Sequence, residues 1–221
     1  MQKQTRGEES RILLRENKKT NSQGLYLDRD GVMIEDVNYI SDPKEVTICP
    51  GLNETLRMAK SLDIPVLIVT NQSGISREKL TWENYYAVTQ RMIEMLDVPE
   101  VVYGIFANST MAFNGNIKEW RKPGAGMILE SSEALNIDIK KSILIGDRIT
   151  DLQAGVNAGM RRVTHVLTGH GKKEREHIPD VIYSTDSNSK AYARVNKCAS
   201  LVEFDLEKEL SLAKEGCKFN D

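Results

Sequence analysis

A regular alternation of short apolar runs with amphipathic segments, across residues 24–167, is what most constrains the fold. Residues 65–69 and 142–146 are almost continuously apolar and rich in β-branched side chains, as in strands that are buried on both faces. Further strands are expected at 24–27, 101–106 and 162–167, and helical spacing marks 51–62, 81–97, 124–135 and 150–158. This order predicts an α/β fold of three α/β/α layers, Rossmann-like, with a central parallel sheet.

Composition and charge narrow the range of partners. The chain has 221 residues, 40% of them hydrophobic, and its 30 basic and 32 acidic residues leave a net charge of −2. This balance gives no electrostatic footprint for nucleic acid or for an anionic membrane. No apolar run approaches the roughly 20 residues of a membrane span, and the N-terminus lacks the apolar core of a signal peptide. A cytoplasmic location is therefore expected, with no nucleic-acid or membrane partner.

The chain is expected to have three parts. Residues 1–22 are polar apart from Ile12-Leu13-Leu14 and are predicted to be an N-terminal extension outside the core. Residues 23–185 hold the alternating elements and form the domain. Residues 186–221 are predicted to be a C-terminal extension, helical and docked on the domain, with a contact between subunits as the alternative. The expected assembly is a monomer or a small homo-oligomer.

Polar side chains follow three of the predicted strands directly. Asp28-Arg29-Asp30 follows the first strand, Thr70-Asn71-Gln72-Ser73 the second, and Asp147-Arg148 the fourth. Ligands of parallel sheets bind beyond the carboxyl ends of the strands, so these residues are expected to converge on one site. Taken alone, each segment has an ordinary structural explanation, such as a solvated acidic turn or a capping turn.

Two further features suit an anion and a cation. Arg121-Lys122 precedes Pro123 at a predicted helix start, a place that favours anions, although an exposed basic pair would look the same. Asp147 and Asp151 are four residues apart, which suits a hard cation, although acidic residues are also common at helix N-termini. The occurrence of all these segments in one order, each at an element boundary, favours phosphate chemistry.

In this order the segments resemble the four motifs of the haloacid dehalogenase (HAD) superfamily of phosphohydrolases. The resemblance runs from about Leu25 to Thr168 and rests on LDRDGV, VTNQSGI, RKP and the segment around Asp147. It looks closest to the branch with the D-glycero-D-manno-heptose 1,7-bisphosphate phosphatases and the histidinol-phosphate phosphatases. The short connection between the first two motifs implies a minimal cap, and so a small substrate that enters an open site.

The resemblance implies a Mg²⁺-dependent phosphatase that works through an aspartyl-phosphate. Asp28 would be the nucleophile and Asp30 the general acid and base. Thr70 and Lys122 would hold the transferring phosphoryl group. The metal ligands would be Asp28, the backbone carbonyl of Asp30, and Asp147. The residues that would position the rest of the substrate are Asn71, Gln72, Ser73 and Arg121, with Arg148 and the loop Asp36 to Tyr39 as weaker candidates.

The expected substrate is a small phosphorylated metabolite, a sugar phosphate, with D-glycero-D-manno-heptose 1,7-bisphosphate as the leading candidate. Histidinol phosphate is the nearest alternative, because the motif residues do not separate the two. A polynucleotide 3′-phosphatase shares these motifs, but the near-neutral charge argues against it. A non-catalytic binding module on the same fold is the alternative from another class, although Asp28, Asp30, Lys122 and Asp147 are all retained.

One segment departs from the family pattern. Many relatives in this branch bind a structural zinc ion just before the RKP motif through three cysteines and a histidine, but residues 106–120 contain neither residue type. No zinc is therefore expected, and this loop is predicted to be held by packing of Phe113 and Trp120. The histidines (His165, His170, His177) and the cysteines (Cys49, Cys198, Cys217) show no metal-ligand spacing and are expected to be ordinary residues and reduced thiols.

Overall fold

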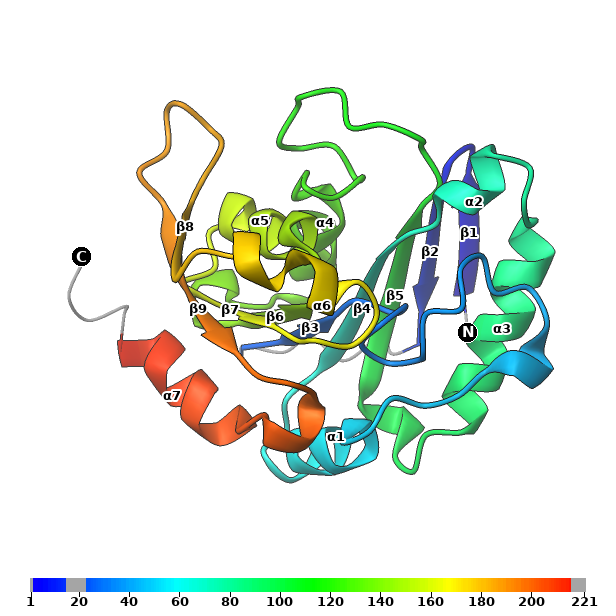
Figure 1. Ribbon diagram of the computed structural model, residues 1–221, viewed down its shortest axis with the longest axis horizontal. Coiled ribbons are helices and arrows are strands. Elements are labelled where there is room, and N and C mark those ends of the chain that lie inside the picture. Colours follow the sequence, from blue (N-terminus) through cyan, green and yellow to red (C-terminus); the bar gives the residue numbers. More distant parts are fainter. Residues whose placement is uncertain (1, 15–22, 216–221) are drawn as a thin grey trace.

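The computed structural model describes residues 2–14 and 23–215 and contains one large sheet (Figure 1). Within these ranges the strand order is β1-β2-β5-β4-β3-β6-β7-β9-β8. The strands are β1 (Gln2–Arg6), β2 (Glu9–Leu13), β3 (Leu25–Leu27), β4 (Val66–Asn71), β5 (Val102–Asn108), β6 (Ile143–Gly146), β7 (Arg162–His165), β8 (Val181–Tyr183) and β9 (Tyr192–Lys197). In the same ranges, no helix has the length and apolar character needed to cross a bilayer.

The helices follow the strands in the expected alternation. The α-helices are α1 (Leu52–Ser61), α2 (Ser73–Ser76), α3 (Trp82–Glu94), α4 (Gly126–Leu135), α5 (Ile149–Ala158), α6 (Gly171–Glu174) and α7 (Leu206–Glu215). Short 3-10 turns are η1 (Pro43–Glu45), η2 (Pro99–Val101), η3 (Ile139–Lys141), η4 (Arg175–His177) and η5 (Leu201–Glu203). Helix α3 begins with a capping box, since Thr81 accepts from the backbone of Asn84 while the Asn84 side chain accepts from the backbone of Thr81.

The core lies on both faces of the parallel strands. In β3, Leu25 and Leu27 point into one apolar cluster and Tyr26 points into the other, as the alternation of a strand requires. The first cluster includes buried residues of α1, α3 and α7, and the second includes those of α4 and α5. In Figure 1, α1 and α7 lie below the sheet and α4 and α5 above it. The predicted three-layer α/β/α fold is confirmed.

The N-terminal residues differ from the expectation of an extension outside the core. Residues 2–13 form the antiparallel hairpin β1–β2, and β2 pairs with β5 so that Ile12 lies opposite Ile105. Ile12 and Leu13 are buried, one in each apolar cluster. The prediction failed because backbone hydrogen bonds join β1 to β2 and β2 to the edge of β5. The outer strand, β1, therefore needs few apolar side chains, and its sequence does not show the apolar pattern of a strand. Residues 15–22 lie outside the described residues.

At the other end of the sheet, the region after residue 186 also contributes a strand. β9 pairs in parallel with β7 and antiparallel with β8, so the predicted C-terminal extension shares the sheet of the domain. The expected terminal helix lies at α7, where Leu206, Leu210 and Ala213 are buried. Arg162 on β7 and the buried Glu209 on α7 form an ion pair at 2.5 Å. Cys49 and Cys198 are free and buried, and Cys217 is outside the described residues.

The loop in the place of the zinc loop is held by one aromatic contact and several polar contacts. Trp120 packs against the second cluster, with its ring 5.8 Å from that of Phe106. The backbone amide of Asn114 donates to Glu119 at 2.9 Å, and Arg121 donates to the carbonyl of Thr110. Phe113 is half-buried and joins none of the three core clusters of the described residues, so Trp120 and these polar contacts fill the predicted role.

Candidate active site

The polar residues that follow the strands line one pocket of about 340 Å³ at the carboxyl edge of the sheet. Of the residues predicted for the site, the pocket is lined by Asp28, Asp30, Thr70, Asn71, Gln72, Ser73, Arg121, Lys122 and Arg148. Asp147 lies beneath it and is buried. The sequence therefore predicted the location of the pocket correctly. The contacts inside it assign several of these residues tasks that the sequence did not predict.

Asp28 follows β3, the central strand, and is held to β6 by its backbone amide, which donates to Ile145 at 3.1 Å. The residue is 7% exposed. Its Oδ1 accepts from the backbone amide of Arg29 at 2.8 Å and from Lys122 Nζ at 2.8 Å, so Oδ2 keeps its lone pairs for another group. Burial raises the pKa of Asp28 to about 7 against the opposing charge of Lys122.

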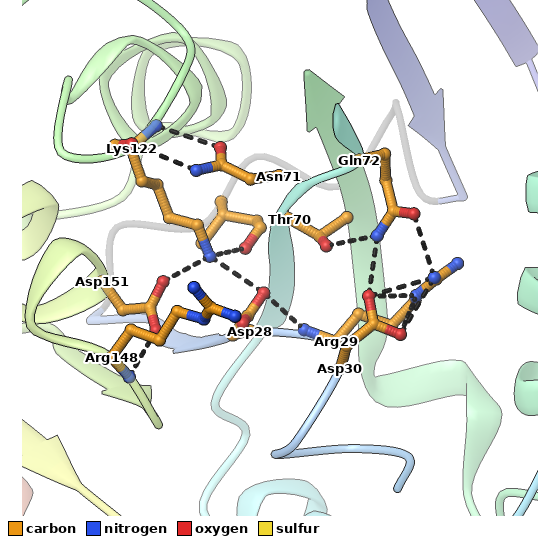
Figure 2. Close-up of polar contacts among 10 residues, drawn as sticks. Asp28, Arg29, Asp30, Thr70, Asn71, Gln72, Lys122, Arg148 and Asp151 are labelled. Carbon is orange, nitrogen blue, oxygen red and sulfur yellow. Dashed lines mark hydrogen bonds and ion pairs between the residues drawn. The ribbon is translucent and has the colours of Figure 1, made fainter. Parts of the chain in front are cut away.

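Lys122 is buried among three acceptors. Its ammonium donates to Asp28 at 2.8 Å, to Asp151 at 2.7 Å and to the carbonyl of Val69 at 2.8 Å (Figure 2). Burial alone would lower the pKa of Lys122, but the charges of Asp151 and Asp28 outweigh burial and raise it. All three donors of the ammonium are therefore used within the protein, and Lys122 must exchange one of them to contact a phosphoryl group as predicted.

The amide side chain of Asn71 fixes the position of Lys122. Asn71 donates to the carbonyl of Lys122 at 3.0 Å and accepts from its amide at 3.0 Å, so both ends of the Asn71 amide are occupied. The sequence predicted a substrate contact for Asn71. Asn71 lines the pocket, and its two bonds to Lys122 also join the end of β4 to the segment that carries the lysine.

Asp30 belongs to a second group of polar contacts. Arg29, buried in the protein, donates to both carboxylate oxygens of Asp30 at 3.0–3.2 Å and lies 5.0 Å from the ring centre of Tyr85. Gln72 donates to Asp30 at 2.7 Å and to the hydroxyl of Thr70 at 2.8 Å. The proton of the Thr70 hydroxyl remains available to a phosphoryl oxygen. Arg29 was expected at the site together with its two aspartate neighbours, but its role of holding Asp30 was not predicted.

Three buried carboxylates could hold a cation. Ligand atoms of Asp28, Asp147 and Asp151 lie within 4.8 Å of one another. Both oxygens of Asp151 already accept, from Lys122 and from the backbone amide of Arg148. Oδ1 of Asp147 is buried and has no hydrogen-bond partner among the described residues. Asp28 Oδ2 and Asp147 Oδ1 are thus the open ligand positions, as predicted for these two residues.

Asp151 adds a third carboxylate to the two carboxylates that were predicted as metal ligands. The side chain of Asp30 is tied to Arg29 and Gln72, so only its backbone carbonyl is left for a metal, and Asp151 is the third carboxylate of the cluster. Burial, together with the nearby charges of Asp151 and Asp28, raises the pKa of Asp147 to about 9. Oxygen donors that repel one another in this way fit a hard divalent cation, which would offset their charge.

Two glycines allow the chain to close over Asp147. Gly31 has φ +84°, and a Cβ there would lie 2.6 Å from Oδ2 of Asp147. A Cβ on Gly169 would lie 2.2 Å from the same oxygen. The next residue, His170, donates its backbone amide to that oxygen at 2.6 Å. His170, expected to be an ordinary residue, therefore lies at the site, where its ring also contacts Asp36 at 3.0 Å.

The rim of the pocket carries three guanidinium groups. Arg121 and Arg148 were predicted from the sequence, and Arg77 was missed because it lies in the loop after the TNQSG segment rather than directly at a strand end. Arg77 and Arg148 are exposed, and both lower the pKa of Arg121, after burial, which has the largest effect. Three like charges at one rim favour a second anionic group on the ligand.

Known proteins resemble the chain in sequence and in fold. The sequence profile of the HAD-hydrolase-like family matches residues 119–186. A D-glycero-beta-D-manno-heptose-1,7-bisphosphate 7-phosphatase of Mesorhizobium japonicum is 36% identical over 146 residues, which cover 62% of this chain and 65% of that protein. A D-glycero-alpha-D-manno-heptose-1,7-bisphosphate 7-phosphatase of Campylobacter jejuni is 31% identical over 69% of this chain and 86% of that protein.

Solved structures agree with these relatives. A HAD-like phosphatase of Mesorhizobium loti superposes with a TM-score of 0.71 at 27% identity, over 95% of this chain and 93% of that one. A D,D-heptose 1,7-bisphosphate phosphatase of B. bronchiseptica, solved with magnesium and phosphate, has a TM-score of 0.64 at 24% identity, over 89% and 99% of the two chains. With the motif residues gathered at one pocket and a relative matched over most of its length, the chain belongs to the HAD-like hydrolase superfamily.

Proposed function

We propose that the protein is a Mg²⁺-dependent phosphatase that cleaves a small sugar phosphate through an aspartyl-phosphate on Asp28. The observation that carries this proposal is the contact of one buried lysine with both Asp28 and Asp151, beside the open oxygen of Asp147. The charge of Lys122 favours the ionised form of Asp28 against the effect of burial, and the second oxygen of Asp28 is left free to attack phosphorus.

In the first step, Asp28 Oδ2 attacks phosphorus, the new O–P bond forms, and the bond from phosphorus to the leaving oxygen breaks. Asp30 gives a proton to the leaving alcohol, and it must first loosen its contact with Arg29 and Gln72. In the second step, Asp30 takes a proton from water, which attacks the aspartyl-phosphate and releases inorganic phosphate. The Thr70 hydroxyl donates to the phosphoryl oxygens in both steps.

The metal would be held by Asp28, Asp147 and the backbone carbonyl of Asp30, with Asp151 retained by Lys122. When bound, Mg²⁺ supplies positive charge against the oxygens of the carboxylates and of the phosphoryl group. The proposed ligands are all oxygen atoms, a set that suits Mg²⁺ better than a softer metal.

The pocket supports a substrate with two phosphate groups. One phosphoryl group is placed by the residues around Asp28, and the guanidinium groups of Arg77, Arg121 and Arg148 line the same pocket at its rim. The two relatives described above are named as heptose-1,7-bisphosphate 7-phosphatases, which have a substrate of this kind. The proposed substrate class is therefore a sugar bisphosphate, with D-glycero-D-manno-heptose 1,7-bisphosphate as the first compound to test.

A phosphate-release assay tests this function. Sugar monophosphates, sugar bisphosphates and histidinol phosphate are compared with Mg²⁺ and with EDTA. Removal of the metal is expected to lower the best rate by about 100-fold or more, because the metal accounts for several kcal/mol of charge stabilisation. Addition of excess Mg²⁺ should restore the rate. Equal rates with Mg²⁺ and with EDTA would contradict the metal assignment, and absence of release from every compound would contradict the phosphatase.

Arg77→Met tests the bisphosphate assignment. The exposed guanidinium of Arg77 lines the pocket, so its loss is expected to raise KM for a sugar bisphosphate by about tenfold, the equivalent of one exposed charge-assisted hydrogen bond. KM for a monophosphate of the same sugar should change less than about twofold, and kcat should be retained for both. Lys79→Met is the matched control, since Lys79 is an exposed cation of the same loop that does not line this pocket. Equal effects on both substrates would contradict the assignment.

A further inference from the structure

Behind the candidate metal site lies a buried histidine that the proposed chemistry does not use. His165 is the last residue of β7 and is 0% exposed. Its Nε2 lies 3.0 Å from the backbone carbonyl of Asp147. On the other side of the ring, Nε of Arg175 donates to Nδ1 at 3.0 Å. The ring thus lies between an arginine and the backbone of a proposed metal ligand.

The partner of Nδ1 determines which ring nitrogen carries the proton. A guanidinium has only donors, so Nδ1 of His165 must present a lone pair to Arg175. The single proton of the neutral ring is then on Nε2, where it points at the carbonyl of Asp147 and forms a hydrogen bond with it. The contacts run in one direction, from Arg175 through His165 to Asp147.

Arg175 is itself fixed by the backbone. Its Nη2 donates to the carbonyl of His165 at 3.2 Å and to the carbonyl of Cys198 at 2.6 Å. The guanidinium therefore joins the ends of two neighbouring parallel strands, β7 and β9, directly behind the ring. A side chain held at three points can orient the ring with little freedom of its own.

Asp147 is held at two different atoms. His165 fixes its backbone carbonyl, and the backbone amide of His170 fixes Oδ2 at 2.6 Å. The remaining oxygen, Oδ1, is the buried one without a hydrogen-bond partner in the described part of the chain. The direction of this open oxygen is thus set before any cation arrives.

We infer that His165 and Arg175 are positioning residues that set the metal affinity of the site by holding Asp147 in its ligating orientation. The inference rests on the metal site of the proposed function. It adds His165 and Arg175, which lie outside the four motifs, to the residues that support this site. A carboxylate oxygen that already has its ligating orientation loses little conformational freedom when the metal binds. Loss of the hydrogen bonds that hold a metal ligand in place weakens metal binding by about 10–100-fold.

Direct metal binding to the full-length protein, measured by calorimetry with Mg²⁺ and without substrate, tests the inference. Arg175→Met and His165→Leu are expected to weaken Mg²⁺ binding by about 10–100-fold. His165→Gln keeps an amide donor for the carbonyl of Asp147 and should recover most of the affinity. Lys173→Met, at an exposed cation of α6, is the matched control and should bind as the wild type does. At saturating Mg²⁺, kcat of Arg175→Met should stay within about threefold of wild type, since no reacting atom is touched.

A spectroscopic readout is independent of the metal. In the metal-free wild type, nitrogen NMR should show His165 as the neutral ring with its proton on Nε2, and Arg175→Met should reduce the population of this form. Equal Mg²⁺ affinity of wild type and Arg175→Met, or a proton on Nδ1 in the wild type, would overturn this inference and leave the proposed function intact. No Mg²⁺ binding by the wild type would overturn both.

Discussion

Asp28→Asn is expected to abolish phosphate release, with a loss of about 10⁴-fold or more in kcat, because an amide oxygen cannot form the aspartyl-phosphate. The fold should be retained. Asp28 is buried, and burial raises its pKa to about 7, which means that the metal-free protein disfavours the charged carboxylate. Asparagine has the same shape and no charge, so the substitution should not disrupt the fold. The measurements are steady-state release of phosphate and circular dichroism of the purified variant.

Mass spectrometry of quenched reactions gives a second test of the nucleophile. The wild type should carry a phosphoryl group on the peptide that contains Asp28, and Asp28→Asn should not. Asp180→Asn removes an exposed carboxylate that does not line the pocket, and this variant is the matched control, expected to turn over at the wild-type rate. Turnover by Asp28→Asn at the wild-type rate would refute the covalent route.

Lys122→Met is expected to have the largest effect on stability. The substitution removes the ammonium that contacts Asp28 and Asp151. The negative charge of the cluster of Asp28, Asp147 and Asp151 is then no longer compensated by the lysine. Loss of one partner of a buried ion pair costs about 3–5 kcal/mol in the free energy of unfolding. Activity should fall as well, by about 10³-fold, because the charge near the phosphoryl group is lost.

The stability that Lys122→Met loses is expected to increase with pH. Burial already raises the pKa of Asp28 to about 7 and that of Asp147 to about 9, above their unfolded values, so the folded metal-free protein binds more protons than the unfolded chain. Carboxylates of this kind contribute stability that is present at low pH and is lost as the pH rises through their folded pKa. The deficit of Lys122→Met in urea unfolding should therefore be larger at pH 8 than at pH 5, and Mg²⁺ should reduce it.

A second substitution separates the charge effect from a packing defect. Adding Asp151→Asn to Lys122→Met removes one uncompensated carboxylate and should recover part of the lost stability at pH 8. Lys118→Met, an exposed lysine of the same loop, is the control and should unfold as the wild type does. A metal-free Lys122→Met as stable as the wild type at pH 8 would show that the lysine does not compensate the cluster.

The central strands could be predicted from sequence because burial on both faces leaves a strong pattern. β4 and β6 are apolar along nearly their whole length, since side chains on either face enter one of the two clusters. β1 and β9 have no such pattern. Their strands are held by backbone pairing to β2 and β7, and backbone pairing places little demand on side-chain type.

The location of the site could be predicted and its internal contacts could not. A strand end fixes where Asp28 and Asp147 lie, because parallel strands bring their carboxyl ends to one edge. The contacts of Lys122 with Asp151, and of Arg29 with Asp30, depend on side-chain directions that spacing does not encode. The bond of Asn71 to the backbone of Lys122 was not predicted for the same reason, since an amide at a strand end suits a phosphate and a backbone segment equally well.

The position of β3 in the strand order has a consequence for local unfolding. With four strands on either side of it, β3 is the last part of the sheet that fraying from the edges can reach. The amides of Leu25–Leu27 should consequently exchange with solvent only on global unfolding, while those of β1 and β8 exchange through small local openings. We therefore expect the proposed nucleophile, Asp28, to follow the strand that is last to unfold, and local opening of the two edge hairpins should leave it in place.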